Sequence, residues 1–379
     1  MTPTTCAQTL DLAQSPMTAP SPAEAFDPCV ADVGIVGGSG YTGALLAELL
    51  LRHPSVRLTQ MSSETLAGTP VPAYLPRVRA DLEFCPQAEV GGVDVAFVCT
   101  PHGEAAPVVR RLLDDGARVI DLSADFRLEA DTYREWYGPH PCPELAPAVY
   151  GLTELHRDEI ASAALVANPG CYPTAALLAL APLRQLGLVD VVIDAKSGVS
   201  GAGKTLKEAT HFCAVDSDLV AYGLQTHRHY PEIAAGLAGS GGVAPVAPGS
   251  ASFPFGASPA TAAHAPSLTF VPHLAPLQRG ISETIYVRPG TLPLPGAEQI
   301  AALFHELYDG ERFVEVCDAP PQLKDVVGTN YCRIHAHVDQ RAGRVVVFSV
   351  IDNLMKGASG QAVQNMNVML GLPEHEGLV

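Results

Sequence analysis

Residues 33–51, VGIVGGSGYTGALLAELLL, contain the pattern that decides the fold. The first four residues are typical of a short buried strand, and the run of Ala and Leu after residue 43 predicts a helix. The glycine-rich segment between them allows a tight turn, where the backbone can approach a pyrophosphate that rests on the helix N-terminus. A strand, a glycine-rich turn and a helix in this order predict a dinucleotide-binding α/β domain.

The glycines of this turn fit two related dinucleotide-binding patterns. Gly38, Gly40 and Gly43 match G-x-G-x-x-G. Gly37, Gly40 and Gly43 match a related pattern in which the glycines are three residues apart. An ordinary glycine turn is the alternative, but the flanking strand and helix favour the binding interpretation. The residues of the turn that we expect at the cofactor are Gly37, Ser39, Gly40, Tyr41, Thr42 and Gly43.

Further apolar runs predict other strands of the same sheet, at residues 56–61, 93–98 and 119–122. Ligands of such sheets bind beyond the carboxyl ends of the strands, so the segments that follow should face the cofactor. Glu64 would repel a 2′-phosphate if it pointed inward, so the sequence leaves NADP and NAD open at this position. The residues expected beside the cofactor are Ser62, Ser63, Pro101, His102 and Ser123.

A reactive cysteine is predicted within residues 165–180, LVANPGCYPTAALLAL. A short apolar run ends in turn residues, and a helical pattern follows, so Cys171 stands at a helix N-terminus. The helix dipole and the unpaired N–H groups there favour thiolate over thiol and could stabilise an oxyanion. A small, buried and unreactive cysteine is the alternative.

Two later stretches carry further candidates. In residues 226–233, THRHYPEI, two imidazoles that can move protons flank a guanidinium that can bind a carboxylate. A metal site is the competing interpretation, but no third Cys or His has suitable spacing nearby, so we expect no metal. Residues 196–204, KSGVSGAGK, place small residues between two lysines, which suits a phosphoryl group; a flexible solvated loop is the alternative.

Composition limits the class of protein. The chain has 379 residues, of which 47% are hydrophobic and 17% charged, as expected for a soluble protein of about two domains. A net charge of −17 argues against nucleic acid and anionic membranes as partners, and no apolar run approaches a membrane span. The nine cysteines are odd in number, none are in Cys-x-x-Cys spacing, and no secretory signal is evident, which predicts a cytoplasmic protein.

The order of elements predicts the domain organisation. Residues 1–30 are expected to be a disordered extension, and residues 31–170 a Rossmann-type domain. Residues 171–352 contain runs of strands without alternating helices, which predict an α+β catalytic, substrate and oligomerisation domain with a mostly antiparallel sheet. Residues from about 238 to 266 are expected to be a flexible insertion, and residues 353–379 contain a final helix.

Six motifs in one order resemble the N-acetyl-gamma-glutamyl-phosphate reductase family (type 1), over about residues 33–372. The resemblance implies NADPH as cofactor, a two-domain subunit like that of aspartate-semialdehyde dehydrogenase, commonly a homotetramer, and a C-terminal helix that returns to the Rossmann domain. The motifs are GGSGYTG (37–43), LSADFR (122–127), NPGCYPT (168–174), SGVSGAGK (197–204), HRHYPEI (227–233) and DNLMKGA (352–358).

The activity implied by the resemblance is NADPH-dependent reduction of N-acetyl-L-glutamyl 5-phosphate to N-acetyl-L-glutamate 5-semialdehyde and phosphate, through a thioester on Cys171, in arginine biosynthesis. The related aminoadipyl-phosphate reductase of lysine biosynthesis is the alternative, and residues 172–174 favour the arginine enzyme. A Cys–His hydrolase or acyltransferase and a non-catalytic nucleotide sensor are alternatives from other classes. The glycine-rich turn and the cysteine–helix junction in one chain argue against both.

The hypothesis assigns a role to each remaining candidate. His227 is expected to be the acid/base, and His229 is a second candidate for the same role. Glu232 is expected to orient the imidazoles. The residues expected to hold the carboxylate and phosphate of the substrate are Ser200, Lys204 and Arg228, and Gly201 and Asn353 complete the set expected at the cofactor.

Overall fold

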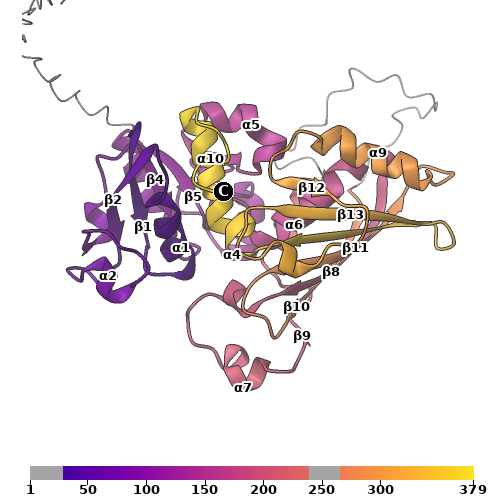
Figure 1. Ribbon diagram of the computed structural model, residues 1–379, viewed down its shortest axis with the longest axis horizontal. Coiled ribbons are helices and arrows are strands. Elements are labelled where there is room, and N and C mark those ends of the chain that lie inside the picture. Colours follow the sequence, from indigo (N-terminus) through magenta and orange to yellow (C-terminus); the bar gives the residue numbers. More distant parts are fainter. Residues whose placement is uncertain (1–28, 239–264) are drawn as a thin grey trace, which may run out of the picture.

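The computed structural model describes residues 29–238 and 265–379. Residues 1–28 of the expected extension and 239–264 of the expected insertion lie outside the described residues. Two sheets form two lobes, and the C-terminal helix lies between them (Figure 1).

The first lobe is built on a parallel sheet, which confirms the predicted Rossmann-type fold. Its strands are β1 (Ala31–Val36), β2 (Val56–Ser62), β3 (Phe84–Cys85), β4 (Val95–Val98), β5 (Arg118–Asp121), β6 (Val149–Tyr150) and β7 (Leu165–Ala167). In the described residues they run in the order β3-β2-β1-β4-β5-β7-β6, and every neighbouring pair is parallel. The expected strands of this lobe are all present, and the short β3 and β6 extend its edges.

Helices cover both faces of this sheet. The helices of the first lobe are α1 (Tyr41–Leu50), α2 (Val71–Tyr74), α3 (Ala105–Asp114), α4 (Ala130–Tyr137), α5 (Thr153–Ser162) and α10 (Gly360–Leu370). Helix α3 packs its apolar face on one side of the sheet. Helices α1, α5 and α10 lie on the other side, where α10 contacts α1 and α5. The last helix of the chain therefore completes the core of the first lobe.

The second lobe is a mixed, mostly antiparallel sheet, as predicted. Its strands are β8 (Leu188–Ser197), β9 (Val220–Ala221), β10 (Ser267–Leu274), β11 (Ile281–Pro289), β12 (Val314–Val316), β13 (Cys332–Asp339) and β14 (Arg344–Ile351). Their order in the described residues is β12-β13-β14-β11-β8-β10-β9. Only the β8–β10 and β12–β13 pairs of this order are parallel.

One helix places the candidate nucleophile between the lobes. The helices of the second lobe are α6 (Cys171–Leu180), α7 (Phe212–Val215), α8 (Tyr230–Ala238) and α9 (Ala297–Tyr308). Helix α6 packs on β11 and β14, and every residue of it after Cys171 is buried. Because the sequence of α6 is apolar on all sides, the helix is fixed by the core, and its first residue is held at the lobe boundary.

The chain between the second sheet and α10 is not a continuous α-helix. The sequence predicts a helix that begins in residues 352–362, whereas the structure has a π-helical turn, η7 (Met355–Ser359), before α10. Such wide turns are often found at functional sites. Among the described residues, no helix is both long and apolar enough to cross a membrane.

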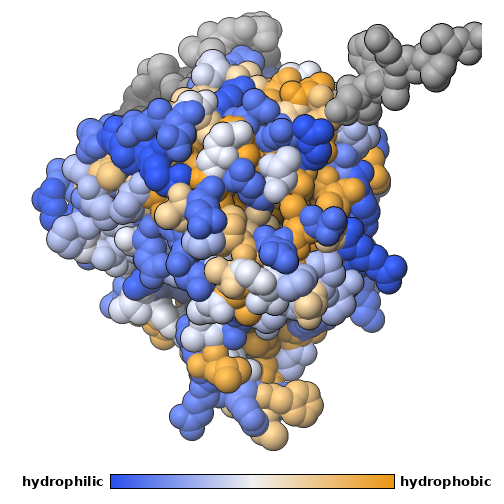
Figure 2. Space-filling model, turned by 90° about the vertical axis from the view of Figure 1, so that its left-hand side faces the viewer, coloured by the Kyte–Doolittle hydropathy of each residue, from blue (hydrophilic) through white to orange (hydrophobic). Residues whose placement is uncertain are grey.

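A segment of the second lobe projects away from the body of the molecule. It contains α7 and β9 and hangs below the sheet in Figure 1. Figure 2 shows hydrophobic side chains at the surface of the lower projection. Leu206 is 98% exposed and Phe212 is 76% exposed, so this projection presents apolar surface to solvent.

Candidate active site

Cys171 is the first residue of α6, directly after the N-cap Gly170, as the sequence predicts. The π-helical turn η7 lies against it. A Cβ atom added to Gly357 would lie 2.8 Å from the Cβ of Cys171, so only glycine allows this close approach.

The protonation state of Cys171 differs from the prediction. Burial is the main cause that raises the pKa of its thiol to about 12, and Glu232 and Glu283 act in the same direction. A backbone N–H group and Arg127 lower the pKa, but they do not offset the loss of solvation. The predicted thiolate is therefore wrong for the free protein, in which Cys171 is a thiol.

A cavity of about 340 Å³ opens in front of Cys171. Three of the predicted site residues in the segment 227–229 line it, and so does Gly201 from the loop after β8. His102 reaches the same cavity from the first lobe, so both lobes form its walls. The structure thus brings together residues that lie far apart in the sequence.

Both predicted acid/base candidates are neutral. Burial lowers the pKa of His227 to about 4, and burial together with the nearby Arg127 guanidinium lowers the pKa of His229 well below its usual value. The His229 backbone N–H donates to Nδ1 of His227 at 3.1 Å, so the proton of the neutral His227 ring is on Nε2. Nδ1 of His229 is buried and has no hydrogen-bond partner among the described residues. His229 can therefore accept a proton at Nδ1, whereas His227 can accept one only if its Nδ1 releases the His229 N–H.

Arg228 is an exposed guanidinium on the rim of the cavity. It lies 5.2 Å from the ring centre of Tyr137 on α4, and the Tyr137 hydroxyl donates to the Arg228 carbonyl. Within the described residues it forms no ion pair with a carboxylate. Its charge is thus available to an anionic ligand in the cavity.

Glu232 lies behind the cavity and does not line it. Its Oε1 accepts the Gly170 backbone N–H and the Tyr150 hydroxyl, both at 2.8 Å, and Oε2 pairs with Arg127 at 3.2 Å. Glu232 therefore does not orient the imidazoles, as the sequence led us to expect. It stabilises the turn before Cys171 instead. Arg127 is the residue that the sequence analysis missed here, although it ends the LSADFR motif.

Glu283 is a second missed residue. It lies on β11 and is 1% exposed, and neither of its carboxylate oxygens has a hydrogen-bond partner among the described residues. Burial raises the pKa of its carboxyl group well above the usual range. A single glutamate in an apolar strand was a signal that could have singled it out.

The two lysines of the segment 196–204 do not converge. Lys196 is paired with Asp194 at 2.6 Å, whereas Lys204 contacts the glycine-rich turn of the first lobe. The Ser200 hydroxyl bonds to Asn353 and is not part of the cavity wall. The two lysines therefore do not bind one phosphoryl group together, as the sequence of this segment led us to expect.

The glycine-rich turn fits a dinucleotide. Gly37 has φ +79°, and a Cβ atom there would lie 2.9 Å from the Cys99 carbonyl oxygen. A Cβ atom at Gly40 would meet nothing within 4 Å. Since Gly40 is the N-cap of α1, open space at this residue lets a pyrophosphate approach the helix N-terminus. The turn therefore has the shape that nucleotide binding requires.

Several other residues expected at the cofactor hold the turn and its neighbours in place. The Ser62 hydroxyl accepts the Gly37 N–H at 3.1 Å. The buried Ser123 hydroxyl donates to Asp121 at 2.7 Å, and Asn353 accepts the Gly280 N–H at 2.7 Å. Among the others, Ser39, Tyr41, Thr42, Gly43 and Ser63 lie at the turn or beside it, and Pro101 is exposed in the loop after β4.

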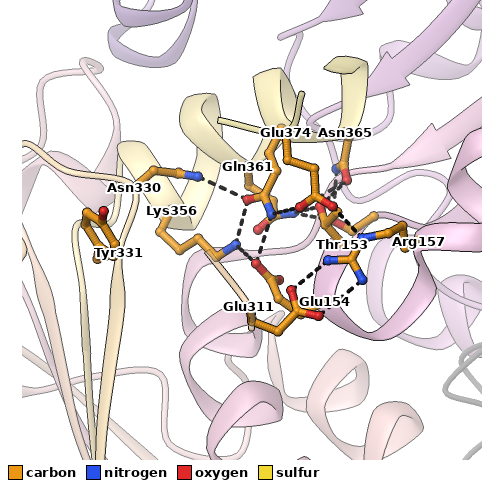
Figure 3. A network of polar contacts seen from close by, with 12 residues as sticks. Thr153, Glu154, Arg157, Glu311, Asn330, Tyr331, Lys356, Gln361, Asn365 and Glu374 are labelled. Atoms are coloured by element: carbon orange, nitrogen blue, oxygen red, sulfur yellow. Dashed lines mark hydrogen bonds and ion pairs between the residues drawn. The ribbon is translucent and has the colours of Figure 1, made fainter. Parts of the chain in front are cut away.

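Behind Cys171 the two lobes are joined by buried polar side chains, shown in Figure 3. Lys356 of η7 is fully buried, and its Nζ donates to Glu154 at 2.6 Å and to Gln364 at 2.8 Å. Asn330, next to β13, also donates to Gln364, at 3.0 Å. We call Lys356, Glu154, Gln364 and Asn330 the rear network.

The segment around η7 connects this network to the turns in front of it. The Ser359 hydroxyl donates to the carbonyl of Thr42 in the glycine-rich turn, and Asn168 donates to the carbonyl of Ala358. Asn168 also accepts a hydrogen bond from Asn365 of α10. The glycine-rich turn and the turn before Cys171 are thus both hydrogen-bonded to the buried segment around η7.

Comparison with known proteins agrees with this architecture. Residues 32–163 match the family model for the NAD-binding domain of semialdehyde dehydrogenases, and residues 171–248 and 257–353 match their dimerisation domain. Aspartate semialdehyde dehydrogenase II from Vibrio cholerae has the same fold, with TM-score 0.68, 17% identity, and 90% of this chain and 98% of that chain covered. The enzyme from Candida albicans, solved with NADP, has TM-score 0.64 and 14% identity at the same coverage.

The fold and the site define a two-domain semialdehyde dehydrogenase. Among its relatives is the N-acetyl-gamma-glutamyl-phosphate reductase of Dehalococcoides mccartyi, which is 47% identical over 353 residues, 91% of this chain and 96% of that protein. The one from Pseudomonas aeruginosa is 46% identical over 360 residues, 91% of this chain and 97% of that protein. The chain belongs to the N-acetyl-gamma-glutamyl-phosphate reductase family, an oxidoreductase family that uses a nicotinamide cofactor.

Proposed function

We propose that this chain reduces N-acetyl-L-glutamyl 5-phosphate to N-acetyl-L-glutamate 5-semialdehyde and phosphate, with NADPH, in cytoplasmic arginine biosynthesis. The observation that carries the proposal is that Cys171 opens into the same cavity as His227, His229 and Arg228. The names of the relatives support the acyl phosphate of N-acetylglutamate over the aminoadipyl alternative.

In this mechanism Cys171 is the nucleophile, and a histidine must remove the proton of its thiol. Because the thiol is protonated in the free protein and both imidazoles are neutral, His227 or His229 can accept that proton as Sγ attacks the acyl carbon. A carbon–sulfur bond forms, the carbon–oxygen bond to phosphate breaks, and phosphate leaves. The product is a thioester, which divides one difficult displacement into two easier steps.

When bound, the nicotinamide supplies the hydride that converts the thioester to a thiohemiacetal. His227, as imidazolium, protonates the oxygen that gains negative charge, and N–H groups at the start of α6 stabilise this oxygen. The imidazole takes the proton back as the carbon–sulfur bond breaks and the semialdehyde leaves. The proton then returns to Sγ of Cys171, which restores the free enzyme.

Arg228 is proposed to bind the carboxylate of the substrate. Its guanidinium is exposed on the cavity rim and stacked on Tyr137, so it can present its forked N–H groups without first breaking an ion pair. Ser200 lies outside the cavity wall and its hydroxyl is held by Asn353, so we do not retain its expected contact with the substrate. Glu232 acts through the Gly170 N–H and so positions Cys171.

The chain is further proposed to form a homo-oligomer, with a tetramer expected. The exposed apolar side chains of the projection around α7 support this proposal, because apolar patches of this kind mark protein–protein contacts. The match of the second lobe to a dimerisation domain supports it as well.

The test of the reaction is Cys171→Ser. We expect semialdehyde formation and NADPH oxidation to fall about 10³-fold or more, because the nucleophile is lost. Cys213→Ser, which removes an exposed thiol on the projection, is the matched control and should keep the wild-type rate. A Cys171→Ser enzyme with near wild-type rate would falsify the mechanism.

The same assay separates the alternatives. Hydrolysis of the acyl phosphate without NADPH consumption would favour a hydrolase. Faster reduction of the aminoadipyl homologue would favour the lysine-pathway enzyme.

A further inference from the structure

Lys204 is a cation without a carboxylate partner, held over the glycine-rich turn. Its Nζ donates to the Ser39 carbonyl at 3.0 Å and lies 3.2 Å from the Ser39 hydroxyl. The Tyr74 hydroxyl is 3.3 Å from the same ammonium. All three are neutral oxygens, and no ion pair to Lys204 occurs in the part of the chain that the structure describes. No described carboxylate therefore occupies this ammonium group, and it is available to an anionic ligand.

The hydroxyls around Lys204 lie where the adenosine half of a dinucleotide binds. Ser39 is in the turn after β1, and Ser63, which directly follows β2, donates to the Ser39 hydroxyl at 3.1 Å. In Rossmann domains the end of β2 contacts the ribose hydroxyls, and NADP carries its additional phosphate there. We call Ser39, Ser63, Tyr74 and Lys204 the ribose cluster. It offers three hydroxyls and one positive charge.

Glu64, the nearest acidic residue in sequence, is held by another contact. Its Oε1 accepts the backbone N–H of Gln87 at 2.7 Å. The carboxylate that the sequence places against a 2′-phosphate is thus committed to the chain after β3. Within residues 29–238 and 265–379, no carboxylate forms a hydrogen bond or ion pair with the ribose cluster.

A positive charge at this place favours phosphate binding because the chain is strongly acidic. With a net charge of −17, a local cation favours the binding of a phosphate because it offsets the field of the protein. Arg77, which follows α2, is ion-paired with Glu48 at 3.1 Å. Lys204 comes from the second lobe, so a phosphate bound to it would be held between the lobes.

We propose that Lys204 selects the phosphorylated dinucleotide by pairing with its 2′-phosphate, while the hydroxyls of Ser39 and Ser63 donate to the phosphate oxygens. This assignment replaces the expected contact of Lys204 with the substrate, and it rests on the proposed use of a nicotinamide dinucleotide. It also accounts for NADP selection in a chain that has a glutamate directly after the β2 serines.

The test measures binding without turnover. Calorimetric titration with 2′,5′-ADP and with 5′-ADP compares two probes that differ only in the 2′-phosphate. We expect the wild-type enzyme to bind 2′,5′-ADP more tightly, and Lys204→Gln to weaken that binding about 10-fold to 100-fold, as for a lost hydrogen bond to a charged group. Binding of 5′-ADP should change less than about twofold.

Two further variants control the experiment. Lys207→Gln removes an exposed lysine three residues further along the same segment and should bind both probes as the wild type does. Lys204→Arg keeps the charge and should retain most of the preference. If both Lys204 variants bind 2′,5′-ADP as the wild type does, or if Lys204→Gln weakens both probes equally, the proposal is wrong.

The outcome is separable from that of the proposed reaction. The probes contain neither nicotinamide nor acyl phosphate. Selective binding of 2′,5′-ADP through Lys204, without semialdehyde formation, would support this assignment and refute the reaction. The wild-type enzyme could instead form semialdehyde with NADPH while Lys204→Gln leaves the affinities for 2′,5′-ADP and 5′-ADP unchanged. That result would refute only the role of Lys204.

Discussion

The two sides of Cys171 are built in different ways. Behind it, the rear network is fully buried, and the Lys356 ammonium is satisfied by side chains from α5 and α10. In front of it, the segment 227–229 forms part of the cavity wall; Arg228 is exposed there, and one ring nitrogen of His229 has no hydrogen-bond partner among the described residues. The residues that stabilise the structure thus lie behind Cys171, and the side chains available to a ligand lie in front of it. Variants on the two sides should therefore fail in different ways.

The largest effect is expected in front. His227→Gln should lower the rate of semialdehyde formation by about 10²-fold to 10⁴-fold, because a positioned proton donor and acceptor is lost. The free energy of unfolding should fall by only about 1–2 kcal/mol, because the ring loses its contacts with Tyr172, Tyr222 and Phe270 but no buried ion pair is broken. The measurement is a rate assay combined with urea unfolding of the same variant. His229→Gln, assayed in parallel, shows which ring carries the proton, and a larger loss there would reverse the assignment.

Behind Cys171 the effect should appear in stability. Lys356→Met leaves the Glu154 carboxylate buried without its cation, which should cost about 3–5 kcal/mol of unfolding free energy. Urea unfolding measures this loss. Lys324→Met, an exposed lysine of the second lobe, is the control and should stay within about 0.5 kcal/mol of the wild type. The double variant Lys356→Met/Glu154→Leu should recover part of this loss of unfolding free energy. If Lys356→Met alone costs less than about 1 kcal/mol, the Lys356–Glu154 pair does not hold the lobes together.

The smallest effect concerns the thiol between the two sides. Because burial raises the pKa of Cys171 to about 12, the thiolate fraction should rise about tenfold for each pH unit throughout the range from 7 to 9. The alkylation rate of the free enzyme by iodoacetamide should follow that rise without levelling off. Cys171→Ser supplies the background from the other cysteines. A plateau below pH 8 would show that the free enzyme already holds a thiolate.

Local patterns in the sequence were sufficient for much of the fold. The alternation of short apolar runs, turn residues and helical segments predicted the parallel sheet, and the position of Cys171 at the start of α6 followed from residues 165–180. These features depend on neighbours within a few residues, which a single sequence displays. The π-helical turn before α10 was missed, because it depends on the packing of Gly357 against Cys171 and on the buried bonds of Lys356.

The sequence by itself determined which groups are present: a glycine-rich turn on a strand and helix, a cysteine at a helix start, and a histidine–arginine–histidine segment. Only the tertiary structure decided their charge states and their partners. Glu232 meets Arg127 across 105 residues, and Lys204 meets Ser39 across 165. Burial, which the sequence does not display, outweighs the helix N-terminus and keeps the Cys171 thiol protonated. Desolvation and long-range contacts are properties of the packed chain, whereas strand and helix patterns are properties of its local segments.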